Sequence, residues 1–212
     1  MTRALVVYCH PQEGSFAAAV RKVVVSRLRA AQSEIRVRDL YAEGFQPLLT
    51  QAEWSGYLDA PANRAPVESH VADLEWCDTL IFIYPTWWYG LPAMLKGWLD
   101  RVLLPDVAFL MPKAAGETIR PGLHHITRMG VFTTCGASWR LTRLVGAPGR
   151  RTLMRGVGFL LKPRAKKVFA ATYLMDSATP EALARHLQRV AAKTDRLIGA
   201  SAAPEMERAP AE

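Results

Sequence analysis

Short apolar runs alternate along this chain with segments whose apolar residues recur at helical spacing. Runs this short and this apolar are typical of strands covered on both faces, and one alternating run is typical of an outer strand. Helical spacing follows the first, third and last runs, and two of these helices open on a proline. The alternation predicts an α/β protein with a doubly wound, five-stranded parallel sheet. The predicted strands are residues 4–9, 35–40, 78–84, 126–134 and 166–173, and the three helices are 16–28, 92–104 and 180–198.

The segments between these elements are less regular. Residues 51–57 and 67–76 have helical character, and residues 59–66, with two prolines, predict a loop. Residues 105–121 carry prolines, glycine and few periodic positions, which predicts an excursion with a hairpin. We expect residues 1–200 to form a single domain. Residues 201–212, rich in Ala, Pro and Glu, predict a disordered tail.

Composition indicates the size of this domain, its cellular location and the state of its cysteines. The chain has 212 residues, half of them hydrophobic, which suffices for one larger domain with a substantial core. No apolar run approaches the roughly 20 residues that cross a bilayer, and no cleavable signal pattern is seen at the N-terminus. We therefore expect a cytoplasmic protein without membrane insertion. Cys9, Cys77 and Cys135 are far apart and odd in number, which predicts reduced thiols rather than disulfides or a metal site.

Positive charge is concentrated in one half of the chain. The formal net charge is +8, and residues 118–175 contain eleven Lys or Arg and no Asp or Glu. Such a segment attracts anions, whether a nucleotide phosphate, an acidic partner or nucleic acid, although a merely solvated basic face explains it equally well. No stacking platform or helix-turn-helix pattern supports nucleic acid, so we expect no nucleic-acid partner.

The loop after the first predicted strand contains groups that could bind a phosphate. It contains neither Gly-x-Gly-x-x-Gly nor Gly-Lys-Ser/Thr, so it is not an ordinary nucleotide loop. His10 can donate to an anion, and the Ser15 hydroxyl can do the same. The amides of Ser15, Phe16 and Ala17 are expected to face outward from a helix N-terminus. These groups could hold one phosphate, and a plain N-cap after a loop histidine is the alternative.

Three adjacent aromatic residues follow the third predicted strand, between Pro85-Thr86 and Gly90. A buried strand is predicted to end, and a helix to begin, at Trp87, Trp88 and Tyr89. Large rings in such a connection are energetically costly. The carboxyl end of a parallel strand is where open α/β sheets bind ligands, and these rings suit a flat ring system. Gly90 would permit close backbone approach. The alternative is that individual rings pack on a neighbouring helix or on a second subunit.

A third distinctive loop follows the fourth predicted strand. Thr133, Thr134, Cys135 and Gly136 are small and hydroxyl-rich, as suits the edge of a heterocycle. Distinctive loops thus follow the first, third and fourth strands. A ligand site at the switch point of the sheet requires that arrangement, and it favours the flavodoxin-like strand order 2-1-3-4-5.

The three loops together resemble those of a known flavoprotein family. The run from Pro85 to Val102 looks like a flavin loop and its following helix, and His10-Pro11 with Ser15-Phe16 is similar to a phosphate loop. The run Thr133-Thr134-Cys135-Gly136 resembles a Thr-Thr-Gly-Gly loop. The family is that of the flavodoxin-like NAD(P)H:quinone oxidoreductases, which includes mammalian quinone reductase, bacterial modulators of drug activity and the ancillary flavoproteins of potassium efflux systems. The match covers most of the chain up to about residue 198.

The resemblance implies how a flavin would lie. Trp88 and Tyr89 would lie against the isoalloxazine, and backbone groups of residues 86–89 would bond its edge. Thr133, Thr134 and Gly136 would approach its other side. The cofactor-binding residues implied by the loops are His10, Ser15, Phe16, Ala17, Pro85, Thr86, Trp87, Trp88, Tyr89, Gly90, Thr133, Thr134, Cys135 and Gly136.

The resemblance also implies an activity. NAD(P)H would pass hydride to the flavin N5 and leave, and a quinone would then take its place and receive two electrons, which is a ping-pong reaction. The flavin would carry the chemistry, so no catalytic side chain is singled out. FMN is favoured over FAD, because a helix N-terminus suits a terminal phosphate and the chain is short for an FAD-binding member. Ala17 stands where many members have Asn, and Cys135 replaces a Gly. The Tyr and His of the mammalian enzyme have no counterpart near residues 139–144.

Partners follow from the same resemblance. The family is generally dimeric, so we expect a homodimer whose second subunit completes the site. A regulatory flavoprotein that binds a membrane transporter is the alternative function. A one-electron carrier of the flavodoxin type fits less well, because such carriers dock through acidic surfaces and this chain is basic.

Overall fold

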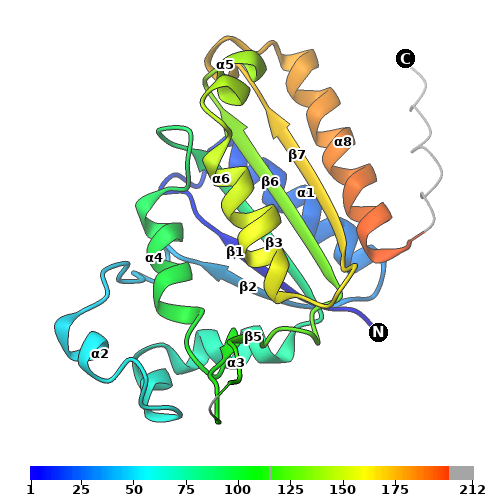
Figure 1. The fold of residues 1–212 in the computed structure, drawn as a ribbon. Helices are drawn as coiled ribbons and strands as arrows, with labels where there is room; N and C mark the ends of the chain where they lie inside the picture. Colours follow the sequence, from blue (N-terminus) through cyan, green and yellow to red (C-terminus); the bar gives the residue numbers. More distant parts are fainter. Residues whose placement is uncertain (115, 201–212) are drawn as a thin grey trace, which may run out of the picture.

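A single parallel sheet forms the centre of the molecule in the computed structural model, which describes residues 1–114 and 116–200 (Figure 1). Its strand order is β2-β1-β3-β6-β7, and every pairing is parallel. The predicted order 2-1-3-4-5 is therefore confirmed. The strands are β1 (Arg3–Tyr8), β2 (Glu34–Asp39), β3 (Thr79–Thr86), β6 (Arg128–Cys135) and β7 (Lys166–Thr172).

Helices cover both faces of the sheet (Figure 1). One face packs against α1 (Phe16–Ala30) and α8 (Pro180–Ile198), which lie side by side. The other face packs against α3 (Glu68–Trp76), α4 (Ala93–Val102) and the π-helical segment η2 (Thr152–Val157). Seven of the eight residues of β3 are buried, which explains why its sequence is an uninterrupted apolar run.

Smaller elements complete the described chain. The predicted hairpin within 105–121 is present as an antiparallel pair of two-residue strands. The predicted loop 59–66 is wrong in part, because a 3₁₀-helix begins at Ala62 and accommodates the Pro66 ring. The predicted tail 201–212 lies outside the described residues. The remaining elements are α2 (Gln51–Ser55), η1 (Ala62–Val67), β4 (Phe109–Leu110), β5 (Arg120–Pro121), α5 (Trp139–Leu144), α6 (Pro148–Arg151), α7 (Gly158–Leu160) and η3 (Met175–Ser177).

Within residues 1–114 and 116–200, no helix combines the length and the apolar character that crossing a membrane requires.

The register of the central strands determines where the loops meet. Tyr8 at the end of β1 pairs with Ile83, and Thr86 at the end of β3 pairs with Cys135 at the end of β6. The loops that follow β1, β3 and β6 therefore leave the sheet at one edge. The strand order reverses between β1 and β3, and that switch point is where open α/β sheets bind ligands.

Helix α4, which begins directly after the aromatic loop, is held by contacts with residues 46–53. The Arg101 guanidinium donates through Nε to Glu53 Oε1 at 2.8 Å and through Nη1 to the Gln46 carbonyl. Gly97 packs against the backbone of Pro47 so closely that an added Cβ would collide with the Pro47 carbonyl oxygen. These contacts position the helix and hence the loop that leads into it.

Gly97→Ala is expected to lower the free energy of unfolding by about 1–3 kcal/mol, because overpacking displaces either α4 or the Pro47 segment. Urea denaturation followed by circular dichroism measures the change. Gly156→Ala is the matched control, because nothing lies within 4 Å of a Cβ built there. Equal stability of the two variants would contradict the close packing.

Candidate active site

The aromatic loop contains a tight turn with an uncommon backbone. The Gly90 N–H donates to the Trp87 carbonyl at 2.9 Å, and the two central residues, Trp88 and Tyr89, have φ angles of 47° and 60°. Two positive φ angles define a type I′ turn, which ordinarily uses Asn and Gly. An L-residue in this region costs roughly 1–2 kcal/mol. Such an outlier is most often kept for function.

The turn directs the Trp88 ring into solvent. This side chain is 95% exposed, whereas the Trp87 side chain is 42% exposed and that of Tyr89 is half-buried. The alternative that Trp88 packs on a neighbouring helix is therefore wrong for the described chain. Its ring is available to a ligand or to a second subunit.

Helix α6 supports the turn from behind. The Gly149 N–H points toward the Tyr89 carbonyl at 3.4 Å, and a Cβ built on Gly149 would lie 3.0 Å from the Gly90 carbonyl carbon. Only a glycine at position 149 permits this approach without displacement. Gly90 was expected to allow close backbone approach, and in the structure its close neighbour is this helix.

The N-terminus of α1 has the geometry expected of an anion site. Ser15 is its N-cap, and the Ser15 hydroxyl oxygen accepts from the Ala18 N–H at 3.2 Å. No acceptor among the described residues is found for the N–H groups of Phe16 and Ala17. The expectation of a free amide at Ser15 is wrong, because the Ser15 N–H donates to the Gln12 carbonyl at 3.3 Å in a tight turn. Two backbone donors and a hydroxyl remain for an anion.

The Nδ1 of His10 lies close to two backbone atoms of Gln12. It accepts the Gln12 N–H at 3.0 Å in one tautomer, and it donates to the Gln12 carbonyl oxygen at 3.2 Å in the other. Burial lowers the pKa of His10 from its ordinary value of 6.5, and the backbone of Gln12 opposes this effect. In the tautomer whose Nδ1 accepts, the ring can donate through Nε2–H. The Tyr8 hydroxyl lies 3.3 Å from the Ser15 Oγ, a partner that sequence reasoning missed.

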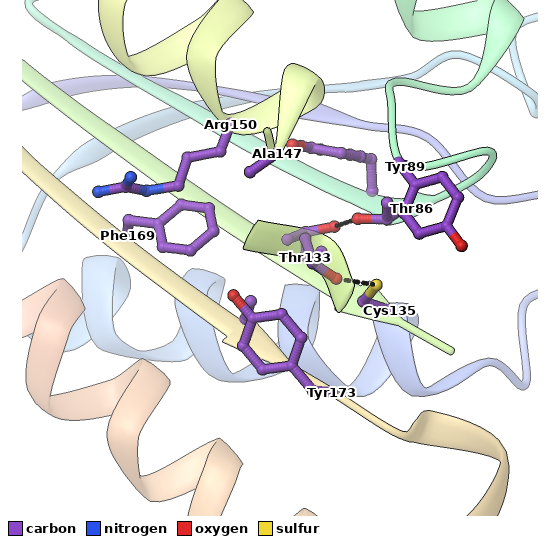
Figure 2. Close-up of a pocket in the computed structure, with 11 residues that line it drawn as sticks. Thr86, Tyr89, Thr133, Cys135, Ala147, Arg150, Phe169 and Tyr173 are labelled. Carbon is purple, nitrogen blue, oxygen red and sulfur yellow. Dashed lines mark hydrogen bonds between the residues drawn. The ribbon is translucent and has the colours of Figure 1, made fainter. Parts of the chain in front are cut away.

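The third loop is connected to the aromatic loop by hydroxyl groups. The Thr86 and Thr133 hydroxyl oxygens lie 2.8 Å apart, and the Cys135 Sγ lies 3.5 Å from the Thr142 Oγ1 (Figure 2). The side chains of Thr133, Thr134 and Cys135 are buried, so direct ligand contact at this edge falls to backbone groups and to residues 136–137.

A cleft of about 280 Å³ lies between the second and third loops. This volume is near the lower end of ligand pockets, which span about 300–1,000 Å³. Five of the predicted site residues line the cleft, and Trp88 is one of them. Five others from the second and third loops do not line it: Pro85, Trp87, Gly90, Thr133 and Thr134. His10 and the α1 N-terminus lie at the neighbouring strand end, where the Cys9 N–H donates to the Ile83 carbonyl at 3.0 Å. The cleft is lined by Thr86, Trp88, Tyr89, Cys135, Gly136 and Ala137.

A small cavity next to this cleft contains residues that the sequence did not single out (Figure 2). It measures about 20 Å³, enough for one water molecule. Tyr173 follows the last strand of the sheet, and burial raises its pKa above the ordinary value of 10.0 while the charges of Arg150 and Arg143 oppose the rise. The position of Tyr173 at a strand end was a signal that could have found it. Arg150, Phe169, Ala147 and Thr142 also line the cavity.

A family model described as a flavodoxin-like fold matches residues 2–194. The chain belongs to this family. The flavodoxin-like chain is 34% identical over 125 residues to NAD(P)H dehydrogenase [quinone] 1 of Cavia porcellus, a match that covers 51% of this chain and 46% of the relative. The chain thus spans about half the length of the curated relatives it matches. The resemblance identified from the loops is confirmed.

Solved structures agree with this family. A crystal structure from Streptococcus mutans UA159 superposes with a TM-score of 0.77 at 28% identity, covering 92% of the flavodoxin-like chain and 99% of its own. An FMN-dependent NADH-azoreductase from Bacillus anthracis, solved in complex with FMN, gives a TM-score of 0.73 at 16% identity and covers 93% of this chain and 99% of its own. The second likeness concerns the fold alone.

The backbone strain at Trp88 predicts how the free energy of unfolding differs between two variants at this position. Trp88→Gly is expected to raise the free energy of unfolding by about 0.5–1 kcal/mol relative to Trp88→Ala, because glycine relieves the left-handed strain at a cost in chain entropy. Both variants lose an exposed ring, so the comparison isolates the backbone. Chemical denaturation of both variants measures it, and a Gly variant no more stable than the Ala variant would show that the turn is unstrained.

Proposed function

We propose that this chain is a flavin-dependent NAD(P)H:quinone oxidoreductase. The observation that carries the proposal is the strained Trp88–Tyr89 turn, which holds an exposed ring at the switch point beside an anion-suited helix N-terminus. Strained backbone clusters at active sites and ligand-binding segments, and here two consecutive aromatic residues have left-handed angles. The names of its relatives, which are quinone dehydrogenases, support the same assignment.

The residues present fit a flavin mononucleotide. The Trp88 ring and the 280 Å³ cleft suit one face of a planar ring, and the free N–H groups of Phe16 and Ala17 suit a terminal phosphate. The Ser15 hydroxyl and the His10 Nε2–H add two donors. When bound, the flavin supplies hydride transfer, which side chains do not perform. FMN is favoured over FAD because a single helix N-terminus accommodates one phosphate monoester, and two structural neighbours were solved in complex with FMN.

The protein's own contribution is to position the groups around the cleft. The Thr86–Thr133 hydroxyl pair fixes the spacing between the second and third loops, and α6 holds the aromatic turn through Gly149. NAD(P)H and a quinone would use the same open side of the cleft in turn, which agrees with the exposure of Trp88.

Purified protein is expected to carry or bind FMN, to show the absorbance of oxidised flavin, and to reduce a benzoquinone with NADPH. Trp88→Ala should weaken FMN binding roughly tenfold, because a stacked ring contributes about 0.5–1.5 kcal/mol beyond its buried area. Fluorescence titration of the apoprotein measures this affinity.

Trp54→Ala is the matched control for this titration, because Trp54 is also exposed but lies in α2, outside the cleft lining. A colourless protein that binds neither FMN nor FAD would overturn the proposal. An equal loss of affinity in both tryptophan variants would make Trp88 an ordinary surface residue.

The proposed enzyme is a homodimer. An exposed apolar side chain near the site supports this, since Leu144, two residues after Thr142 of the small cavity, is 84% exposed. Sedimentation velocity is expected to give twice the chain mass of 23.5 kDa. A protein that stays monomeric at micromolar concentration while reducing quinone would show that one chain suffices.

A further inference from the structure

A second open cavity lies beyond the small cavity of Figure 2, next to the edge strand β7. Its volume is about 290 Å³, similar to that of the candidate cleft. The small cavity shares Tyr89 and Cys135 with the cleft, and it shares Arg150 and Tyr173 with the second cavity. The three spaces therefore lie next to one another, and a ligand in the cleft has a neighbouring site along the same wall of the protein.

Three arginines give this second cavity its character. Arg143, Arg150 and Arg189 all line it, and none of them forms an ion pair with a carboxylate of residues 1–114 or 116–200. Some arginines elsewhere in the described chain, such as Arg27, form such pairs and others, such as Arg155, do not, but here three unpaired guanidinium groups line one cavity. This concentration of positive charge suits a site that receives an anion from outside.

Aromatic rings hold two of these guanidinium groups. The Arg143 Cζ lies 5.1 Å from the ring centroid of Trp139, and the Arg150 Cζ lies 5.1 Å from that of Phe169. A cation–π contact orients a guanidinium without neutralising it, so its N–H groups stay available for hydrogen bonds. Figure 2 shows Arg150 extended beside the Phe169 ring of β7, with Tyr173 just past the end of that strand. The phenol of Tyr173 adds a neutral donor.

The number of donors indicates the class of anion. A carboxylate is satisfied by one bidentate arginine, whereas a phosphate monoester carries about −1.5 to −2 charges and three strong acceptor oxygens. Three guanidinium groups and a phenol match the phosphate monoester. The exposed face of Trp139 also offers a surface on which a base can stack.

We infer that the Arg143–Arg150–Arg189 cavity binds the 2′-phosphate of NADPH while the nicotinamide half lies at the open side of the neighbouring cleft, against the flavin. This inference rests on the proposed function, and it specifies the reductant as NADPH rather than NADH. Free phosphate shares the same chemistry and is distinguished by the experiment.

Calorimetric titration of the full chain with 2′,5′-ADP and with 5′-AMP tests the assignment directly. The expected result is that 2′,5′-ADP binds at least tenfold more tightly than 5′-AMP to the unsubstituted protein. Arg150→Gln should remove most of this difference. Arg155→Gln, which changes the net charge equally at an exposed residue outside the cavity lining, should preserve it.

Three outcomes would overturn the inference. The first is equal affinity for the two nucleotides, and the second is an equal loss of selectivity in both glutamine variants, which would indicate a bulk charge effect. The third is Arg150-dependent binding of inorganic phosphate without any preference for 2′,5′-ADP, which would identify free phosphate as the ligand. Unchanged thermal melting of both variants controls for folding.

The failure of this inference can be told apart from failure of the proposed function. A protein that prefers 2′,5′-ADP through Arg150 but reduces no quinone retains the phosphate site and loses the proposed reaction. An active quinone reductase that uses NADH and NADPH equally, with no preference between the nucleotides in the titration, retains the reaction and loses the site.

Discussion

Parallel pairing of β3 between β1 and β6 is the constraint on which the candidate site depends. Parallel strands expose all their carboxyl ends at one edge, and the register sets the end of β3 beside the ends of its two neighbours. The anion-suited helix, the aromatic turn and the hydroxyl-rich loop therefore converge without any long connection between them. Burial of almost every residue of β3 keeps the strand at the centre of the sheet, because its removal would expose apolar side chains from both faces.

The aromatic turn shows how the fold maintains a locally unfavourable conformation. Trp88 and Tyr89 adopt left-handed backbone angles that a free peptide would avoid, and the Trp88 ring gains almost no burial in return. The surrounding framework provides the compensation, through the close approach of Gly149 behind the turn and the packing of α4 against Pro47 ahead of it. Rigid elements on both sides thus fix a loop that presents its ring outward.

Much of this arrangement was predictable from the chain, and the reasons for the exceptions are physical. Apolar runs such as β3 identify strands because both faces are buried, and the cap at Ser15 is a local signal that needs no tertiary information. The engaged amide of Ser15 depends on how the preceding turn closes onto Gln12, which composition does not reveal. Arg150 and Tyr173 come together only through the packing of α6 over the edge of the sheet. Side chains joined by tertiary packing have no spacing in the sequence that could identify them.

The position of a bound flavin is the most direct test of the candidate site. A crystal structure of the protein grown with FMN is expected to show the isoalloxazine in van der Waals contact with the Trp88 ring and the phosphate hydrogen-bonded to the N–H groups of Phe16 and Ala17. A flavin bound elsewhere, or an aromatic turn that packs against protein while the cleft stays without flavin, would contradict it.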